Sequence, residues 1–154
     1  MPTEIDLEQL EVLTTDECLI LLARTAIGRV GFVVAGQPHV LPVNYLADTD
    51  GTIVFRTHDR SILTGVAGHP ATFEVDGYDE RRRLGWSVCV HGDGRDITNV
   101  DDPTARRLRA LDVVTWAPGR RDRWFAITAD EITGRRIPLR ASPASFGWVP
   151  GVVS

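Results

Sequence analysis

The stretch from Gly28 to Ser61 decides the fold: it reads Gly-Arg-Val-Gly-Phe-Val-Val at 28–34, His-Val-Leu-Pro-Val-Asn-Tyr-Leu-Ala at 39–47 and Thr-Ile-Val-Phe-Arg-Thr at 52–57. β-Branched and aromatic residues fill these three runs, and Gly, Pro and Asp occupy the connections between them, as strands and tight turns require. The pattern predicts two consecutive hairpins, and therefore three antiparallel strands.

The end of the third predicted strand collects polar side chains. Arg56, Thr57, Arg60 and Ser61 place two guanidinium groups and two hydroxyls within six residues. This composition predicts an anion site at one sheet edge, and we expect a cofactor phosphate there. Asp59 is expected to cap a second helix, with Arg60 and Ser61 in its first turn, where free amides favour anions. The apolar stripe of that helix is Ile62, Leu63, Val66 and Ala67.

Pro42 interrupts the second predicted strand. Proline has no N–H to donate to a ladder, so it indicates an edge position or a bulge. Neighbouring backbone groups would then be free to pair with a planar heterocycle, or the strand would simply be an edge strand. The residues leave both readings open.

The rest of the chain predicts short helices and further strands. Thr14-Thr-Asp-Glu17 has the form of a capping box, and Asp102-Pro103 is typical of a helix start. Strands are expected at 71–76, at 85–92 with a continuation past a Gly-containing bulge, and at 124–133. The order predicts a mainly β fold with minor α, an antiparallel split β-barrel with flanking short helices. We expect one domain over 14–137, an N-terminal arm over 1–13 and a C-terminal tail over 138–154.

Composition narrows the function classes. The chain has 154 residues and a formal net charge of −4, which disfavours general nucleic-acid binding. All 17 basic residues are Arg, so no lysine can form a Schiff base. Cys18 and Cys89 lie in apolar runs and are expected to be buried thiols, with no metal site. The acidic N-terminal residues and the lack of a membrane-length apolar run predict a cytoplasmic protein without membrane contact.

Several stretches together resemble the pyridoxamine 5'-phosphate oxidase-like family of FMN-binding split barrels, in its actinobacterial and nitroimidazole-resistance-like branch. The resemblance covers roughly residues 14 to 137, and order and spacing carry it rather than one motif. The matching stretches are 28–31, 38–44, 53–57, 73–76, 85–88 and 132–137.

The resemblance implies a homodimer with two flavin sites at the subunit interface. It places Val40, Leu41, Pro42, Val43 and Asn44 along the edge of the isoalloxazine ring, contacting it mostly through backbone. The family commonly has a lysine just after Ser61, and this chain has Ile62 there.

The resemblance also implies a phosphate end of the site. Phe55, Arg56 and Thr57 would flank the ribityl-phosphate, and Arg60 and Ser61 would close around it. Trp86 and Ser87 would serve the same end of the cofactor, and Arg135 or Arg136 would reach the partner's site. No catalytic residue is assigned.

These expectations favour an FMN-dependent oxidoreductase acting on an unidentified small molecule. One alternative is a deazaflavin-dependent reductase, whose acidic cofactor tail could meet Arg81–Arg83, although a run of three arginines is more often a solvated surface. Another is a non-catalytic flavin- or haem-binding dimer, which Ile62 favours. Pyridoxamine phosphate oxidation itself is not expected, because only Arg140 follows the Arg135-Arg136 pair.

Overall fold

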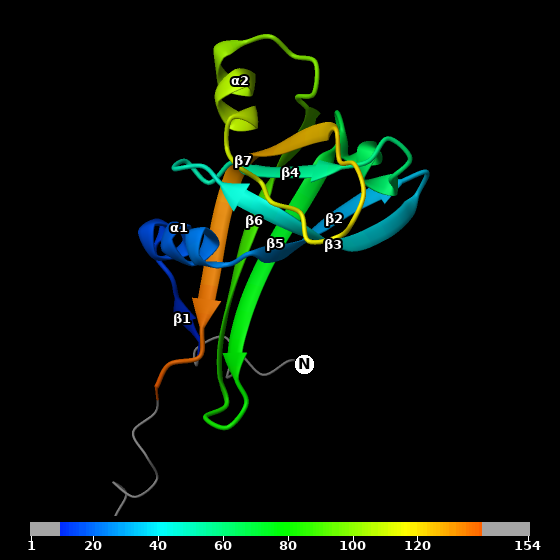
Figure 1. The fold of residues 1–154 in the computed structure, drawn as a ribbon. Helices are drawn as coiled ribbons and strands as arrows, with labels where there is room; N and C mark the ends of the chain where they lie inside the picture. The colour runs from blue at the N-terminus through cyan, green and yellow to red at the C-terminus, as the bar shows by residue number, and fades with distance from the viewer. Residues whose placement is uncertain (1–9, 140–154) are drawn as a thin grey trace, which may run out of the picture.

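The computed structural model describes residues 10–139. Only residues 10–13 of the predicted arm and 138–139 of the predicted tail therefore fall within it. The described chain forms seven strands, two α-helices and one 3-10 helix (Figure 1). In chain order these are β1 (Glu11–Val12), α1 (Thr15–Arg24), β2 (Ile27–Val34), β3 (Gln37–Ala47), β4 (Ile53–Thr57), η1 (Ile62–Val66), β5 (Pro70–Asp79), β6 (Leu84–Asp96), α2 (Pro103–Arg109) and β7 (Arg123–Arg136).

The strands form one antiparallel sheet that closes on itself. Their order is β1-β7-β4-β3-β2-β5-β6, and an additional pairing of β6 with β7 closes the ring. The two predicted hairpins are confirmed: β2 pairs with β3, and β3 pairs with β4. Ala35 and Gly36, with φ of 49° and 76°, make the tight turn of the first hairpin. The predicted antiparallel split barrel with short flanking helices is therefore confirmed.

Strand β3 pairs with a different neighbour along each part of its length. Its neighbour β4 pairs with Tyr45–Ala47 alone, whereas β2 pairs with 37–44. Pro42 lies opposite Arg29 of β2, in the half of β3 that β4 does not reach. The prediction that Pro42 marks an edge position is confirmed, because β2 is the one described neighbour of β3 over 37–44.

A bulge bends the long β6–β7 ladder. The register shifts between His91, opposite Glu131, and Gly92, opposite Ala129, so Asp130 is the extra residue. The bulge predicted near the glycines of β6 is confirmed, and its extra residue lies on β7. A Cβ on Gly92 would fall 1.7 Å from the carbonyl oxygen of Thr128, so only glycine fits this close approach.

Two apolar clusters stabilise the fold. The barrel interior holds the fully buried rings of Phe55, Phe73 and Phe125, and α1 covers one end with Cys18 and Leu22. The second cluster lies on the other side of β4 and β7, beneath α2. Its buried members are Val54, Ile97, Ala105, Leu108, Val113 and Ala126.

Both predicted helix starts next to these clusters are confirmed. Thr14 and Glu17 form the capping box of α1, with bonds of 2.8 and 3.2 Å. Asp102 caps α2, and Pro103 follows it as the first helical residue. None of the helices within residues 10–139 is long and apolar enough to cross a membrane.

The prediction for the segment after β4 is wrong in its detail. A five-residue 3-10 helix begins at Ile62, and Ser61, not Asp59, caps it through a 3.2 Å bond from the Leu63 N–H to its hydroxyl. Asp59 does not cap a helix because its carboxylate pairs with Arg123 at 3.3 Å. Arg60 and Ser61 therefore precede the helix and do not lie in its first turn.

Candidate functional site

The strand registers define which residues point outward from the barrel sheet. Pro42 of β3 lies opposite Arg29 of β2, Arg29 opposite Glu74 of β5, Glu74 opposite Cys89 of β6 and Cys89 opposite Thr133 of β7. Directly opposed residues point to the same face of a sheet, and every second residue along a strand shares that face. We call this side of strands β3, β2, β5, β6 and β7 the outer face.

Part of the predicted site lies on the outer face. Val40, Pro42 and Asn44 of β3 lie on it, and Val40 is 68% exposed. Ser87 of β6 and Arg135 of β7 also lie on it and are directly opposed to each other. These five predicted residues therefore all point outward from the barrel, in two groups on strands that are three apart in the closed ring.

Three other predicted residues point inward. Val43 is 7% exposed and belongs to the barrel core, and Leu41 and Trp86 pack against that core. A ligand on the outer face could reach Leu41 and Val43 only through their backbone groups.

A charged cluster on the outer face was not predicted from the sequence. One guanidinium nitrogen of Arg29 lies 3.3 Å from Glu74 and 3.1 Å from Asp76. Burial and the neighbouring Asp76 carboxylate raise the pKa of Glu74 above its ordinary value, against the opposing effect of Arg29. The signal in the sequence was the alternation of Glu74 and Asp76 along one strand, but only the strand pairing shows that Arg29 faces both.

The end of β4 separates the predicted phosphate residues. Phe55 is fully buried and Thr57 is 4% exposed, both toward the barrel core. Arg56 points to the other side, where its Nε donates to the carbonyl oxygen of Arg121 at 2.9 Å and its guanidinium lies 4.7 Å from the ring centre of Trp124. Its Nη1 lies 3.5 Å from the Val113 carbonyl oxygen.

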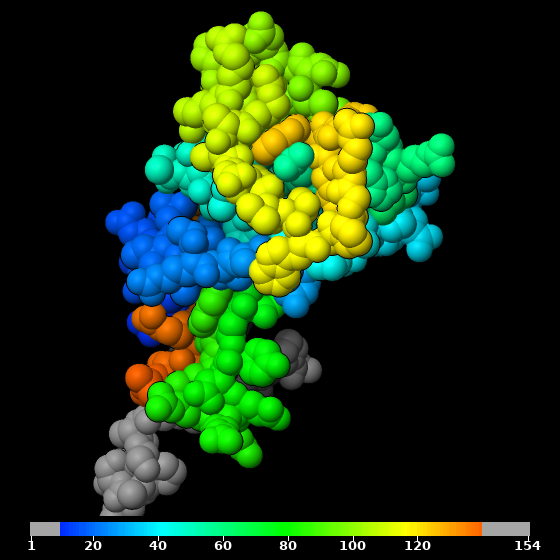
Figure 2. All heavy atoms as spheres, viewed as in Figure 1, coloured from blue at the N-terminus to red at the C-terminus, as the bar shows by residue number. Residues whose placement is uncertain are grey.

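Arg56 therefore holds the segment between α2 and β7. We call residues 110–122 the 110–122 loop. In Figure 2 this loop, in yellow, forms a rim around a hollow in whose floor the colours of β4 and β7 are visible. Sequence reasoning did not predict this loop as part of the site.

Arg60 and Ser61 have different surroundings from Arg56. The Ser61 hydroxyl accepts from Leu63, and its carbonyl oxygen accepts from the Thr64 hydroxyl at 2.9 Å. Arg60 is exposed and lines a polar cavity of about 360 Å³. The other lining residues are His58, Asp59, Arg120 and Asp122. No described contact joins Arg56 to Ser61.

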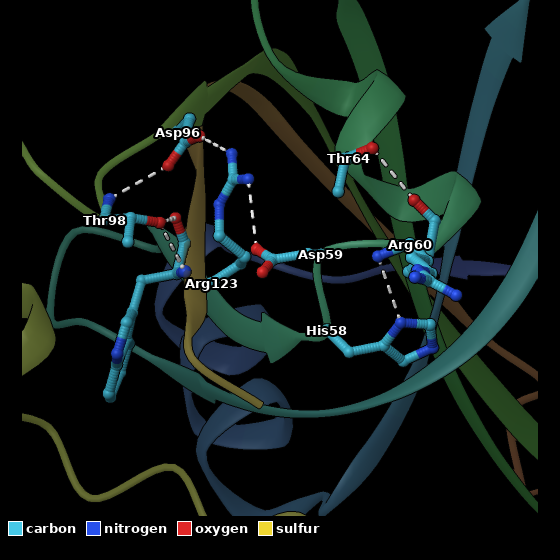
Figure 3. Close-up of polar contacts among 9 residues, drawn as sticks. His58, Asp59, Arg60, Thr64, Asp96, Thr98 and Arg123 are labelled. Atoms are coloured by element: carbon cyan, nitrogen blue, oxygen red, sulfur yellow. Dashed lines mark hydrogen bonds and ion pairs between the residues drawn. The ribbon is translucent and has the colours of Figure 1, made fainter. Parts of the chain in front are cut away.

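Arg123 binds the Asp59 carboxylate on the side away from Arg60 (Figure 3). It pairs with Asp96 and with Asp59, while the side chains of His58 and Arg60 lie together on the other side of Asp59. Although burial opposes the change, hydrogen bonds from Thr98 and the Arg123 guanidinium lower the pKa of Asp96, which keeps it charged. Arg60 has no ion-pair partner within residues 10–139, so its charge is available to an anion.

A second cavity, of about 300 Å³, lies where the 110–122 loop meets β3. The backbone N–H of Trp116 donates to the Asn44 side-chain oxygen at 2.8 Å, and the Asn44 amide lies 3.4 Å from the Ala26 carbonyl oxygen. The Asn44 side chain is thus fixed between two segments of its own chain. The lining residues are Ala23, Arg24, Thr25, Ala26, Asn44, Tyr45, Leu46, Asp112, Val114 and Trp116.

Comparison with known proteins identifies the family. Residues 14–136 match the model of the family described as pyridoxamine 5'-phosphate oxidase, and the chain belongs to this family. An uncharacterised protein of Mycobacterium tuberculosis, Rv0080, is 38% identical over 133 residues, which cover 81% of this chain and 84% of that protein.

Solved structures share the same fold. A FAD-binding protein from Mycobacterium smegmatis is 28% identical, with a TM-score of 0.64 over 84% of this chain and 99% of that one. A protein from Corynebacterium glutamicum, described as a putative pyridoxamine 5'-phosphate oxidase, is 25% identical, with a TM-score of 0.67 over 86% and 97%. A protein from Bacteroides thetaiotaomicron, described as a putative 5-nitroimidazole resistance protein, is 14% identical and has a TM-score of 0.60 over 82% and 87%. At that identity the similarity concerns the fold alone.

Proposed function

We propose that the protein is a flavin-dependent oxidoreductase that acts on a small molecule as a homodimer, with each flavin held between the outer faces of two subunits. Family membership supports this proposal, as does the similarity to a FAD-binding protein over almost its whole length. A bound flavin would supply the hydride or electron transfer that amino-acid side chains cannot perform. The chain itself would bind the cofactor, orient it and exclude water.

The ring end of the flavin is assigned to the half of β3 that β4 does not reach. Within residues 10–139, the backbone N–H and C=O groups on that side have no strand partner between 37 and 44, so they are available to the polar edge of a heterocycle. Val40, Pro42 and Asn44 direct their backbone groups to this open edge, because alternate residues of a strand bond to opposite neighbours, and they also supply the outward surface, whereas the backbone groups of Leu41 and Val43 point to β2. This open strand edge beside exposed apolar residues is the observation on which the proposal depends most.

The phosphate end is assigned to the corner between β4 and η1. Among the described residues of this corner Arg60 is the cation without an ion-pair partner, and Thr57 and Ser61 lie on either side of the turn that carries it. Phe55 fixes the end of β4 in the core, and Arg56 positions the adjoining 110–122 loop. We propose FMN as the cofactor, and FAD is the other flavin to test because a similar protein binds it.

The distance across the outer face favours a dimer. Strand β6 is the third strand from β3 in either direction around the closed ring, so Ser87 lies on the opposite side of the barrel from β3. A flavin along β3 would therefore meet Ser87 and Arg135 of the partner more readily than those of its own chain. The exposed Val33 and Val40, at 54% and 68%, are typical of a surface that a second subunit covers.

The absorbance spectrum of the purified protein tests the proposal. We expect flavin absorbance, the release of FMN or FAD on denaturation, and a dimeric mass by light scattering. The apoprotein should bind FMN, FAD or a deazaflavin in titration, and the tightest ligand identifies the cofactor. A colourless protein that binds none of the three would contradict the proposal. A flavin that binds but accepts no electrons from any donor tested would instead indicate a non-catalytic binding protein.

A further inference from the structure

The 110–122 loop carries an exposed aromatic side chain beside the candidate site. Trp116 is 67% exposed, and Val114 of the same loop is 63% exposed. Together with Leu46 of β3 they line the cavity of about 300 Å³ described above, whose volume is at the lower end of the range of small-molecule sites. A large exposed indole in a concave site is an informative exception to the burial of aromatic residues.

The position of Trp116 is fixed by side chains of the sheet. Asn44 accepts from the Trp116 N–H at 2.8 Å, so the backbone of Trp116 is bonded directly to β3. Arg56 reaches the Val113 carbonyl oxygen at 3.5 Å on one side of Trp116 and the Arg121 carbonyl oxygen at 2.9 Å on the other. Two residues of the predicted flavin site therefore hold the loop that presents this indole.

Trp124 provides the contrast within the same region. Its ring packs against the second apolar cluster and has the Arg56 guanidinium over it, so its burial explains its presence. The Trp116 ring has no such explanation. The polar residues Thr25, Asn44 and Asp112 line its cavity as well, and this mixture fits a small ligand with polar and planar parts.

We propose that Trp116 is a cofactor-binding residue whose indole forms an aromatic wall against the flavin ring where the ring passes Asn44. This inference rests on the proposed function, because it needs a flavin along β3. It adds to that proposal a residue from the 110–122 loop. The contact is with the ring, so it does not depend on the cofactor phosphate.

Binding of FMN and of riboflavin to the full-length apoprotein tests this assignment. We expect Trp116→Leu to weaken both ligands by the same factor, roughly 3- to 10-fold, which is the usual contribution of an aromatic pair. Trp116→Phe is the matched control and should bind both ligands nearly as the wild type does. Thermal melting of both variants should be unchanged, since the ring is not part of the core.

The other outcomes separate the two proposals. If Trp116→Leu binds both ligands as tightly as the wild type, the assignment of Trp116 is wrong and the flavin function stands. If the wild type binds none of riboflavin, FMN, FAD and a deazaflavin, the proposed function fails, and the assignment of Trp116 fails with it. If Trp116→Leu becomes monomeric at a concentration where the wild type is dimeric, the indole is covered by a second subunit and the ring contact is refuted.

Discussion

At the scale of single residues, the two arginines of the 56–61 segment differ in what they contact. Arg56 is bonded to backbone carbonyls of the 110–122 loop and lies over Trp124, whereas Arg60 is exposed at a polar cavity. Both arginines lie in one polar segment of the sequence. Side chains alternate along β4, so Arg56, which lies between the buried Phe55 and Thr57, points away from the barrel core. Spacing alone could not show that its partner would be a loop 65 residues away.

Replacement of Arg60 by Ala should weaken FMN and leave riboflavin binding unchanged. A charge-assisted contact to phosphate contributes about 1–3 kcal/mol, so FMN affinity should fall by roughly 5- to 100-fold. Titration of the apoprotein with both ligands measures the difference. Arg81→Ala, at the exposed tip of the β5–β6 hairpin, is the control. Equal loss of both ligands would show that Arg60 does not contact the phosphate.

Replacement of Arg56 by Ala should lower the stability of the folded protein. The change removes a 2.9 Å bond from a charged donor and the contact with the Trp124 ring, which together contribute about 1.5–3 kcal/mol. Denaturant unfolding measures this loss, with Arg81→Ala as the control of matched charge. A variant as stable as the wild type would show that the loop does not depend on Arg56.

Replacement of Glu74 by Gln should flatten the pH dependence of stability above the ordinary carboxylate pKa of 4.5. Because the pKa of Glu74 is raised in the folded chain, the unfolded chain releases this proton first, and stability falls as pH rises from 4.5 toward the raised value. The Gln variant lacks this proton and should lose less stability across that window. Chemical unfolding at several pH values measures the slope, with Glu80→Gln as the control, and identical slopes would contradict the prediction.

At the scale of elements, local patterns predicted much of the barrel. The capping box at Thr14, the Asp102-Pro103 helix start and the three strands from Gly28 were predictable because turn and cap residues fix them locally. The start of η1 was not predictable, because Asp59 forms an ion pair with Arg123, which is distant in sequence. The outer-face cluster of Arg29 and Glu74 depends on the register of β2 with β5, which no local pattern specifies.

The bulge of the β6–β7 ladder should not tolerate a side chain at its glycine. In Gly92→Ala the new Cβ would meet the Thr128 carbonyl oxygen, and the required backbone shift should cost at least about 2 kcal/mol of unfolding free energy. Gly31→Ala is the control, because its Cβ would lie 3.7 Å from the nearest atom, an ordinary contact. Equal melting temperatures for the two variants would contradict this account of the bulge.

At the scale of the whole molecule, the proposed homodimer uses the outer face. The barrel interior is filled by phenylalanine rings, so a cofactor cannot enter it. The outer face combines exposed valines with an incomplete strand ladder and the Ser87–Arg135 pair. These features give a second subunit an apolar surface to cover and polar groups to present to its neighbour's ligand.

A charge at the centre of this face should separate the subunits. Val40→Asp should give a monomer that keeps its fold and loses flavin, because an unpaired carboxylate would be buried at the interface. Ile20→Asp is the control, since Ile20 is an exposed apolar residue, at 50%, that lies on helix α1 and not on a strand of the outer face. Light scattering measures the masses, and a dimeric Val40→Asp protein would exclude this face as the interface.

The incomplete ladder of β3 has a further consequence for the protein before it binds any ligand. A row of unsatisfied amides and carbonyls is a template on which a foreign strand can add, and such addition starts edge-to-edge aggregation. Pro42 lies within that row and has no N–H to donate, so an added strand could not form a continuous ladder there. Pro42, which leaves this edge open to a heterocycle, would therefore also reduce the aggregation of newly synthesised chains through β3.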